Sequence, residues 1–441
     1  MEILIKVVQF FLSLSILIIL HEFGHYATAR LFKIKVEKFY LFFDPWFSLF
    51  KFKRGDTEYG IGWLPLGGYV KIAGMIDESM DKEQMKKPPQ PWEFRTKPAW
   101  QRLIVMVAGV VMNILLAISI YILMLFFIGE RYLPTQNVKY GIAVDSVGYE
   151  IGLRNGDKVL AVDNQFVNNF REIPLEIILN MANTIQVERD GEVVDIEIPE
   201  GFIGELIKSK RVDFISVRTP SVVGGVFEGM PADSAGIKAD DKIIAINNTT
   251  IDFFDEIVEK LQKNKGEEIY VSVLRDERVI DMEVYVPESG LLGIAALSPD
   301  QFLSFSQIEY SFWGAIPAGI AKTYNTTVDY IRQFKLLFTS KEVKATESLG
   351  GFITIGGIFP SQWDWVHFWS ITAFLSVILA FMNILPIPAL DGGHVMFLLY
   401  EMITGRKPNE KILEYAQYAG LILLLSLLLF VNINDVVRLF R

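Results

Sequence analysis

Two histidines and a glutamate near the N-terminus have the spacing of a site that binds a metal ion and a catalytic water. Residues 21–25 read His-Glu-Phe-Gly-His. Positions i and i+4 share one face of a helix, so His21 and His25 can reach the same ion. Glu22 then stands beside the ion, where its carboxylate can take a proton from the bound water. The alternative is a solvated, inert pair at the end of an apolar stretch.

A third ligand must come from elsewhere, because a catalytic zinc ion usually takes three protein ligands and keeps one position for water. Asp391 is an acid at the end of the otherwise uncharged segment 383–394, NILPIPALDGGH. Pro386 and Pro388 break a helix there. Irregular backbone at membrane depth is tolerated where it lines a buried or wet cavity. We therefore expect Asp391 to complete the site, with His394 as a competing ligand or an interfacial residue.

The composition narrows the chemistry further. The 441 residues include no Cys, which excludes disulfides, thiol nucleophiles, iron–sulfur clusters and Cys-ligated zinc. There are four histidines, and we expect the remaining one, His367, to lie at the membrane interface. Zinc suits the ligand types best, although manganese or iron would accept the same residues less typically. A net charge of −10 argues against nucleic acid as a partner.

Four apolar segments are long enough to cross a bilayer, which takes about 20 apolar residues. Their most apolar parts are 3–20, 103–128, 365–385 and 412–431. The first is not followed by a small-residue cleavage site and continues into the His-Glu pair, so we interpret it as a retained helix. The segments predict a multi-pass α-helical membrane protein with four transmembrane helices.

Charges in the connections predict the topology. Residues 27–102 carry 14 Lys and Arg against nine acids, whereas residues 130–306 carry 17 against 31. Because positive residues favour the cytoplasm, the first connection is predicted inside and the second outside. Both termini are then outside. The His-Glu motif and Asp391 both fall near the cytoplasmic side.

The long second connection contains an internal repeat. Residues 151–162 and 235–246 match at an offset of 84, and residues 187–198 and 273–284 match at an offset of 86. Two matches at nearly one spacing indicate duplicated domains of about 80–90 residues. Their Gly-Leu-x-x-Gly-Asp pattern resembles PDZ domains, although Asp240 replaces the usual second Gly in the second copy. Such domains bind extended peptides. A pair of spacers that blocks access is equally compatible.

Two further elements flank the spans. The first connection alternates apolar and polar residues over 35–43, 48–53, 57–65 and 67–75, which predicts a small β-sheet beside the membrane. An exposed edge of that sheet could hold an unwound substrate strand, or the sheet could simply lie on lipid headgroups. Residues 309–339 mix apolar and charged residues at near-helical spacing, which predicts an amphipathic helix on the outer membrane face.

Together, these motifs resemble the site-2 protease family (M50) of intramembrane zinc metalloproteases. The resemblance covers nearly the whole chain: the H-E-x-x-H motif in the first span, N-x-x-P-x-P-x-L-D-G in a later span, PLGGYVK at 65–71 and the tandem PDZ repeats. One departure lies in the second span, where the family usually carries Gly-Pro-x-x-Asn. Here Gly109 and Asn113 are kept but the Pro is missing, so a buried structural Asn fits Asn113 as well as a functional one.

The resemblance implies roles for individual residues. His21, His25 and Asp391 would bind one Zn²⁺ per chain, and Glu22 would be the general base. Asn383 would contact the substrate backbone or stabilise the oxyanion. A substrate-binding strand would comprise Gly68, Tyr69, Val70, Lys71, Ile72, Ala73, Gly74 and Met75, with Asn113 as a further candidate.

The resemblance also implies a cellular role. The protein would reside in the bacterial cytoplasmic (inner) membrane and cleave single-span membrane proteins, such as an anti-sigma factor or a signal-peptide remnant. An upstream site-1 protease would first shorten these substrates outside, and the extracytoplasmic PDZ domains would exclude bulky ones. The competing hypothesis is a catalytically inactive, membrane-anchored PDZ adapter.

The expected layout divides the chain into eight parts. These are 1–30, first span; 31–102, membrane-associated β-region; 103–129, second span; 130–210 and 211–300, PDZ domains; 301–362, amphipathic surface helices; 363–400, third membrane segment; and 401–441, fourth span and C-terminus.

Overall fold

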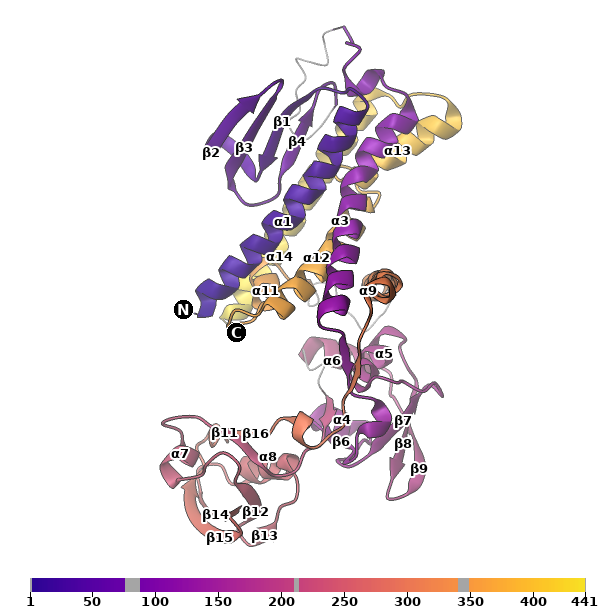
Figure 1. Ribbon diagram of the computed structural model, residues 1–441. Coiled ribbons are helices and arrows are strands. Elements are labelled where there is room, and N and C mark those ends of the chain that lie inside the picture. The colour runs from indigo at the N-terminus through magenta and orange to yellow at the C-terminus, as the bar shows by residue number, and fades with distance from the viewer. Residues whose placement is uncertain (1, 76–87, 210–213, 340–348, 441) are drawn as a thin grey trace. The chain divides into compact units, whose positions relative to one another are not determined.

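The computed structural model describes residues 2–75, 88–209, 214–339 and 349–440 (Figure 1). The chain forms two compact units. The first comprises Met1–Gly129, Glu309–Lys335 and Leu349–Arg441, and the second comprises Glu130–Ile308 and Leu336–Ser348.

Among the described residues, four helices in the first unit are long and apolar enough to cross a membrane, as the sequence predicted. They lie within α1 (Glu2–Leu31), α3 (Ala99–Phe127), α12 (Trp365–Ile384) and α14 (Glu410–Leu439). α3 packs against both α1 and α12. α3 is therefore the helix that lies between α1 and α12 in the packing of this unit.

The third membrane segment is interrupted where its two prolines predicted a break. α12 ends at Ile384, and α13 (Asp391–Thr404) begins only after a six-residue loop. Within that loop Ala389 has a φ of +78°, a left-handed conformation that is uncommon for any residue but Gly. The predicted ligand Asp391 is thus the first residue of a new helix.

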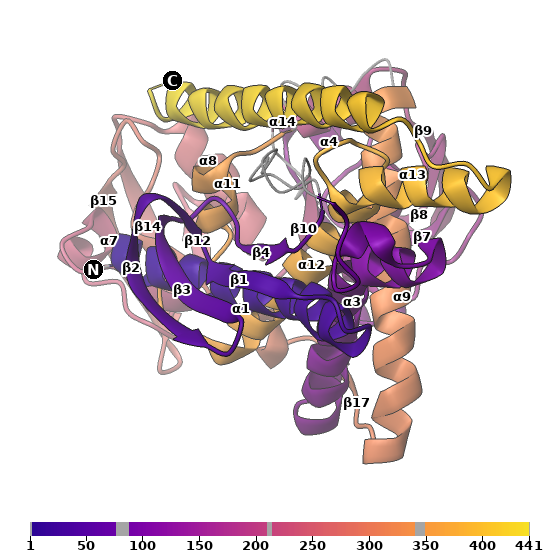
Figure 2. The ribbon, with the colours of Figure 1, turned by 90° about the horizontal axis from the view of Figure 1, so that it is seen from above.

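A four-stranded sheet follows α1, and it confirms the predicted β-region. Its strands are β1 (Val36–Leu41), β2 (Phe43–Arg54), β3 (Thr57–Leu64) and β4 (Tyr69–Ile72), in the order β2-β3-β1-β4. β4 pairs with β1 antiparallel, and β1 pairs with β3 parallel. The sheet lies beside α1 (Figure 2), which contacts both β1 and β4. β4 is therefore an edge strand next to the helix that carries the His-Glu motif.

One strand is longer than the sequence suggested. The ranges expected from the sequence leave the Asp-Pro pair at 44–45 between two strands, at 35–43 and 48–53, but the pair lies inside β2. The register of β2 against β3 shifts between Phe43 and Ser48, and Trp46 has a φ of +72°. A bulge absorbs the proline within an edge strand, where a missing N–H does not break the ladder.

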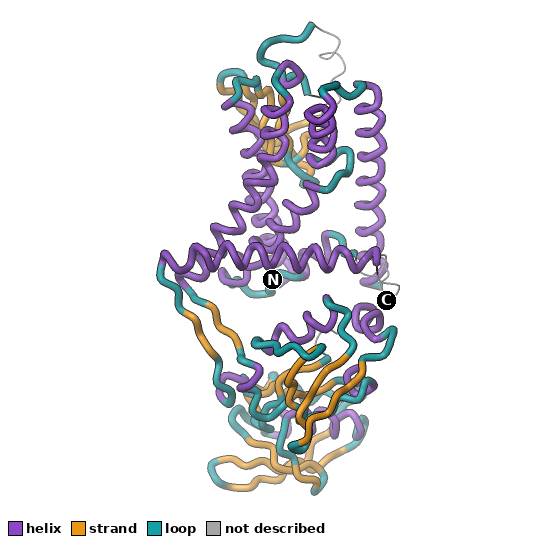
Figure 3. Tube along the Cα trace, turned by 90° about the vertical axis from the view of Figure 1, so that its right-hand side faces the viewer, coloured by secondary structure: helices purple, strands orange, loops and turns teal. Residues whose placement is uncertain are grey.

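The segment after the repeats is helical, as predicted. α9 (Phe312–Thr339) runs across the direction of the long spanning helices (Figure 3), and it is not apolar enough to be a candidate span. The ring of Phe381 on α12 packs against Tyr330 and Phe334 of α9. The short helix α11 (Phe352–Gly357) follows, and Asp435 on α14 accepts hydrogen bonds from Thr354.

The second unit holds two domains with matching strand plans. In the first, β7 (Lys158–Val162), β8 (Thr184–Arg189) and β9 (Glu192–Glu197) form a sheet, and β6 (Ile142–Val144) pairs with β10 (Ile215–Val217). In the second, β12 (Lys242–Ile246), β14 (Glu268–Arg275) and β15 (Arg278–Tyr285) form a sheet that β13 (Thr249–Thr250) extends, and β11 (Val223–Val226) pairs with β16 (Ile294–Ala296). Each domain has its own apolar core.

Further short elements complete the described chain. Helices of the second unit are α4 (Ser146–Glu150), α5 (Ile173–Leu179), α6 (Phe202–Ser209), α7 (Pro231–Ala235) and α8 (Phe254–Lys263). β5 (Glu130–Tyr132) pairs with β17 (Ser306–Ile308). Single 3-10 turns lie at Phe94–Thr96, Thr135–Asn137, Phe170–Glu172 and Pro299–Gln301.

The matched sequence motifs of the two domains build the same contact. Arg189 donates to both carboxylate oxygens of Asp157, and Arg275 does the same to Asp241. Asp240, which departs from the usual Gly, has a φ of +69°. Asp is among the few residues that adopt this left-handed conformation readily, so the departure is tolerated.

Candidate metal centre

α1 brings His21 and His25 onto the side that faces α3. Both side chains are buried. Gly24 lies between them, and a Cβ there would collide with the backbone carbonyl of Ala108 on α3. The Gly of the H-E-x-x-H motif therefore lets the two helices approach until both imidazoles lie against α3.

The loop before α13 folds back tightly on the start of that helix. A Cβ on Gly392 would collide with the carbonyl oxygens of Ile384 and Leu385, and one on Gly393 would crowd the carbonyl of Ile387. The two glycines after Asp391 thus make room for the loop backbone. This packing directs the carboxylate of Asp391 toward α1.

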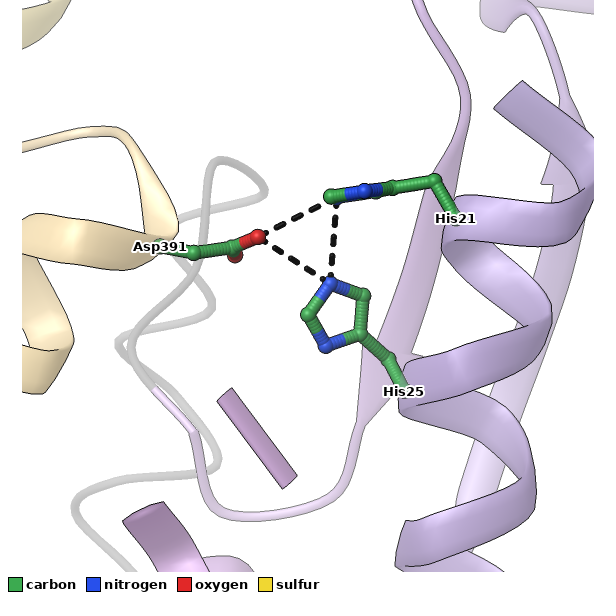
Figure 4. A group of neighbouring side chains, drawn as sticks. All are labelled: His21, His25 and Asp391. Carbon is green, nitrogen blue, oxygen red and sulfur yellow. Dashed lines mark hydrogen bonds and ion pairs between the residues drawn. The ribbon is translucent and has the colours of Figure 1, made fainter. Parts of the chain in front are cut away.

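Three side chains from these two helices converge on one point (Figure 4). Asp391 Oδ2 lies 3.1 Å from His21 Nε2 and 3.2 Å from His25 Nε2, and the two Nε2 atoms are 3.2 Å apart. Of the described residues, these three form the only group of His, Cys, Asp and Glu side chains with the spacing of a metal site. The structure thus brings together the three ligands that the sequence suggested.

The donor atoms fit a zinc ion. In a tetrahedral site with zinc bonds of about 2.0–2.1 Å, ligand atoms lie about 3.3 Å apart, close to the three distances here. His25 Nδ1 lies 2.8 Å from the backbone oxygen of Val105, which can only accept, so Nδ1 carries the proton and Nε2 offers a lone pair. Asp391 Oδ2 is buried and has no hydrogen-bond partner among the described residues. A cation among the three atoms satisfies both groups.

A cavity of about 820 Å³ opens onto these atoms. Glu22 and Asn383 line it, and Asn383 Nδ2 lies 3.4 Å from His21 Nε2. Six residues of the predicted substrate-binding segment also line it: Gly68, Tyr69, Val70, Lys71, Ile72 and Met75. The edge strand β4 therefore forms one wall of the cavity that holds the three ligand atoms.

Some residues singled out from the sequence lie elsewhere. Ala73 is fully buried and Gly74 packs against Glu93, and neither lines the cavity. Asn113 is also fully buried and lies against His21 instead of the cavity. His394 lines the cavity, but its Nε2 is 3.2 Å from Gln417 and it is not part of the ligand cluster.

His367 is on the surface of the structure, and its position at the membrane interface stays a prediction. It lies in the first turn of α12, and its Nδ1 is 2.9 Å from a carboxylate oxygen of Asp364. Its side chain is 70% exposed, and it takes no part in the ligand cluster.

A polar network on the sheet side of the cavity was not predicted. The hydroxyl of Tyr69 donates to Asp44 at 2.7 Å, and Lys38 Nζ lies 3.7 Å from the same carboxylate. Burial and the neighbouring Asp44 carboxylate raise the pKa of Tyr69, so its hydroxyl keeps its proton and acts as a donor. The three side chains come from three different strands, and nothing in their sequence spacing indicates that they meet.

These features define a class of protein. Two His and one Asp converge at a zinc-compatible site among four membrane-spanning helices, with a carboxylate next to the first His. This combination is that of a multi-pass membrane zinc metallopeptidase.

Comparison with known proteins gives the family. The model of Peptidase family M50 matches residues 9–427, and the chain belongs to this family. It is 27% identical to Protease RseP of Yersinia pestis over the full length of both chains. It is also 27% identical to the regulator of sigma E protease of Haemophilus influenzae, over 98% of both chains. A relative from Neisseria meningitidis, whose name describes a zinc metalloprotease, is 28% identical over 98% of both chains.

Proposed function

We propose that this protein is an intramembrane endopeptidase that hydrolyses a peptide bond within or near the transmembrane segment of a single-span membrane protein. The observation that carries this proposal is the convergence of His21 Nε2, His25 Nε2 and Asp391 Oδ2 in a cavity also lined by Glu22 and Asn383. The cavity lies in the unit that contains all four candidate spans.

The residues around the cavity divide the chemistry among them. Zinc held by the three ligands would supply Lewis acidity and a water whose pKa is lowered to about 7. Glu22 is the general base, which accepts the proton of the attacking water and returns it to the leaving amine. Asn383 directs an amide N–H group toward the cavity, where it can donate to the oxyanion of the tetrahedral intermediate.

The edge strand β4 is suited to hold the substrate in an extended form. A helical segment hides its carbonyl groups in its own hydrogen bonds, so it must unwind before cleavage. β4 pairs on one side only among the described strands, and a second extended chain can add to such an edge. A Cβ on Gly68 would lie 3.2 Å from Cγ of Glu22, so the strand starts directly beside the proposed base.

The wider role follows from the relatives. Two of them are named for sigma-E regulation or as RseP. By analogy, the substrates are anti-sigma-factor-like proteins or signal-peptide remnants that an upstream protease has already trimmed outside. The positive charge of residues 27–102 favours a cytoplasmic location for the sheet and the site, with the repeat domains outside the bacterial inner membrane.

The test is cleavage of a single-span reporter in liposomes by wild type and Glu22→Gln, with zinc content measured in both. We expect Glu22→Gln to keep its zinc and to lose about 10²–10⁴-fold in rate, the usual contribution of a general base. Glu2→Gln makes the same change on the same helix and should cleave normally. Equal rates for wild type and Glu22→Gln would contradict the proposal and favour the inactive adapter.

The strand's role has its own test. Lys71→Pro removes a backbone donor from β4, and we expect slower cleavage with unchanged zinc content. Lys51→Pro introduces the same residue into β2, the opposite edge of the sheet, as the matched control. Loss of cleavage in both variants, or in neither, would count against a substrate-binding role for β4.

A further inference from the structure

One face of α3 contacts both imidazoles of the ligand cluster. Val105, Gly109 and Asn113 are spaced four residues apart and so follow one another along one side of the helix. Val105 supplies the carbonyl oxygen that lies 2.8 Å from His25 Nδ1. A Cβ on Gly109 would overlap the rings of both His25 and His21. The side-chain amide of Asn113 lies 3.1 Å from His21 Nδ1.

The two imidazoles need the same tautomer if both are to bind a metal through Nε2. A neutral imidazole carries one proton, so an Nε2 lone pair requires the proton on Nδ1. For His25 the Val105 carbonyl fixes this state, because a carbonyl can only accept. For His21 the matching acceptor must lie near Nδ1. The amide of Asn113 is the group in that position.

The orientation of that amide decides which tautomer it favours. The structure places Nδ2 toward His21, and two donors face each other in that orientation once Nδ1 is protonated. Turning the amide by 180° exchanges two atoms of nearly equal size. The oxygen then accepts the proton of His21 Nδ1, as the Val105 carbonyl does for His25.

Asn113 is held firmly in place. Its side chain is completely buried. Its backbone carbonyl accepts a hydrogen bond of 2.7 Å from Ser376 on α12. Thr372, one turn before Ser376, donates to Ser13 on α1 at 2.9 Å. Such buried polar contacts between spanning helices fix their mutual rotation, so the amide stays beside His21.

We propose that Asn113 is a positioning residue whose Oδ1 accepts the Nδ1 proton of His21 and so leaves His21 Nε2 free to bind the metal. This role replaces the substrate contact expected from the sequence, since Asn113 does not line the cavity. It rests on the proposed function only in that the cluster binds a metal ion. Loss of such an outer partner typically lowers metal affinity by about 10–100-fold.

The variants Asn113→Asp and Asn113→Leu separate the acceptor from the side chain's size. Asp keeps an acceptor toward His21 and has nearly the same shape, whereas Leu fills a similar volume without one. Thr372→Val is the control, because it removes a buried polar contact between α12 and α1 without touching a ligand. Zinc affinity is measured by chelator competition on the full-length protein in detergent. Nitrogen NMR of labelled histidine in the zinc-free protein above pH 8 reads the tautomer of His21, with the signals assigned by single substitutions of the four histidines.

We expect His21 in wild type to carry its proton on Nδ1. Asn113→Leu should lose about 10–100-fold in zinc affinity, while Asn113→Asp and Thr372→Val stay within threefold of wild type or bind more tightly. Equal losses in Asn113→Asp and Asn113→Leu, or an Nε2-protonated His21 in wild type, would overturn the proposal. Failure of wild type to bind zinc at all would instead overturn the metal site itself, and the positioning role with it.

Discussion

Two aspartates of this protein, Asp391 in the membrane unit and Asp241 in the second repeat, have opposite surroundings. Asp241 receives two hydrogen bonds from Arg275 and one from the backbone N–H of Lys238. Asp391 faces the Nε2 atoms of two histidines, and its Oδ2 has no hydrogen-bond donor among the described residues. The protein alone supplies hydrogen-bond donors to the carboxylate of Asp241, whereas it supplies none to Oδ2 of Asp391 among the described residues.

The difference separates a structural carboxylate from a ligand. A buried charge is retained when it is paired, and the Arg pair in both repeats does this. At Asp391 the groups that face the carboxylate are instead the Nε2 atoms of His21 and His25, which offer lone pairs when they bind a metal ion. That arrangement is unfavourable unless a cation joins the three atoms, so the same residue type stabilises the fold in one unit and binds an ion in the other.

The largest expected effect is the loss of metal on removing the unsatisfied aspartate. Asp391→Ala should weaken zinc binding by more than about 100-fold, the upper end of what loss of an outer-shell partner costs. Chelator competition measures this. Asp241→Ala is the matched change in the other unit, and it should bind zinc like wild type. Comparable zinc affinity in the two variants would remove the distinction drawn between these carboxylates.

A smaller loss is expected from crowding the imidazoles. Gly109→Ala places a methyl group where the rings of His21 and His25 lie. Zinc affinity should fall by about 10–100-fold, because both rings must turn away from α3. Val111→Ala lies on the same helix but points away, since Val111 is exposed. If Gly109→Ala binds zinc like Val111→Ala, the close packing of α3 against the ligands is not needed.

Removing the ion pair between Asp241 and Arg275 should lower the stability of the second repeat and leave zinc binding unchanged. Asp241→Asn removes the charge that holds Arg275, and the second repeat should unfold at a temperature lower by roughly 5–15 °C, given about 4–8 °C per kcal/mol for a domain of this size. Hydrogen exchange should accelerate in residues 223–296 while zinc content stays constant. Loss of zinc in this variant would show that the two units are coupled.

The smallest expected effect is a loss of stability of the second repeat at low pH. Burial opposes the charge of Asp241, but hydrogen bonds from Arg275 and the Lys238 backbone outweigh it and lower the pKa from its ordinary value of 3.8. A lowered pKa in the folded state contributes stability that is complete above pH 3.8 and is lost as the pH falls further. Hydrogen exchange of the second repeat between pH 5 and 3 measures this. Asp241→Asn should show a weaker dependence, and an identical profile would contradict the role of this carboxylate.

Much of the site was visible in the sequence. His21 and His25 are linked by helical spacing, and Asp391 stands out as an acid in an apolar segment with two prolines. The helix break, the four spans, the sheet and the duplicated domains were all predicted from periodicity, turn residues and matched motifs. These features leave a sequence signal because each depends on residue types at short or repeated spacing.

The contacts that orient the ligands left almost no such signal. The acceptor for His25 is a backbone carbonyl, which any residue at position 105 would supply. Gly109 and Asn113 were noticed only as part of a family motif, because their role depends on how closely α1 and α3 approach. The network of Lys38, Asp44 and Tyr69 depends on strand pairing with a parallel crossover, which the alternating pattern alone does not determine.

The most direct test of the account is X-ray absorption at the zinc edge on the full-length protein purified without chelators. We predict one zinc per chain, bound by two imidazole nitrogens and a carboxylate oxygen at about 2.0–2.2 Å, with an open position for water. The signal should disappear in Asp391→Ala and persist in Asp241→Ala. A folded wild-type protein without stoichiometric zinc, or an unchanged zinc spectrum in Asp391→Ala, would contradict it.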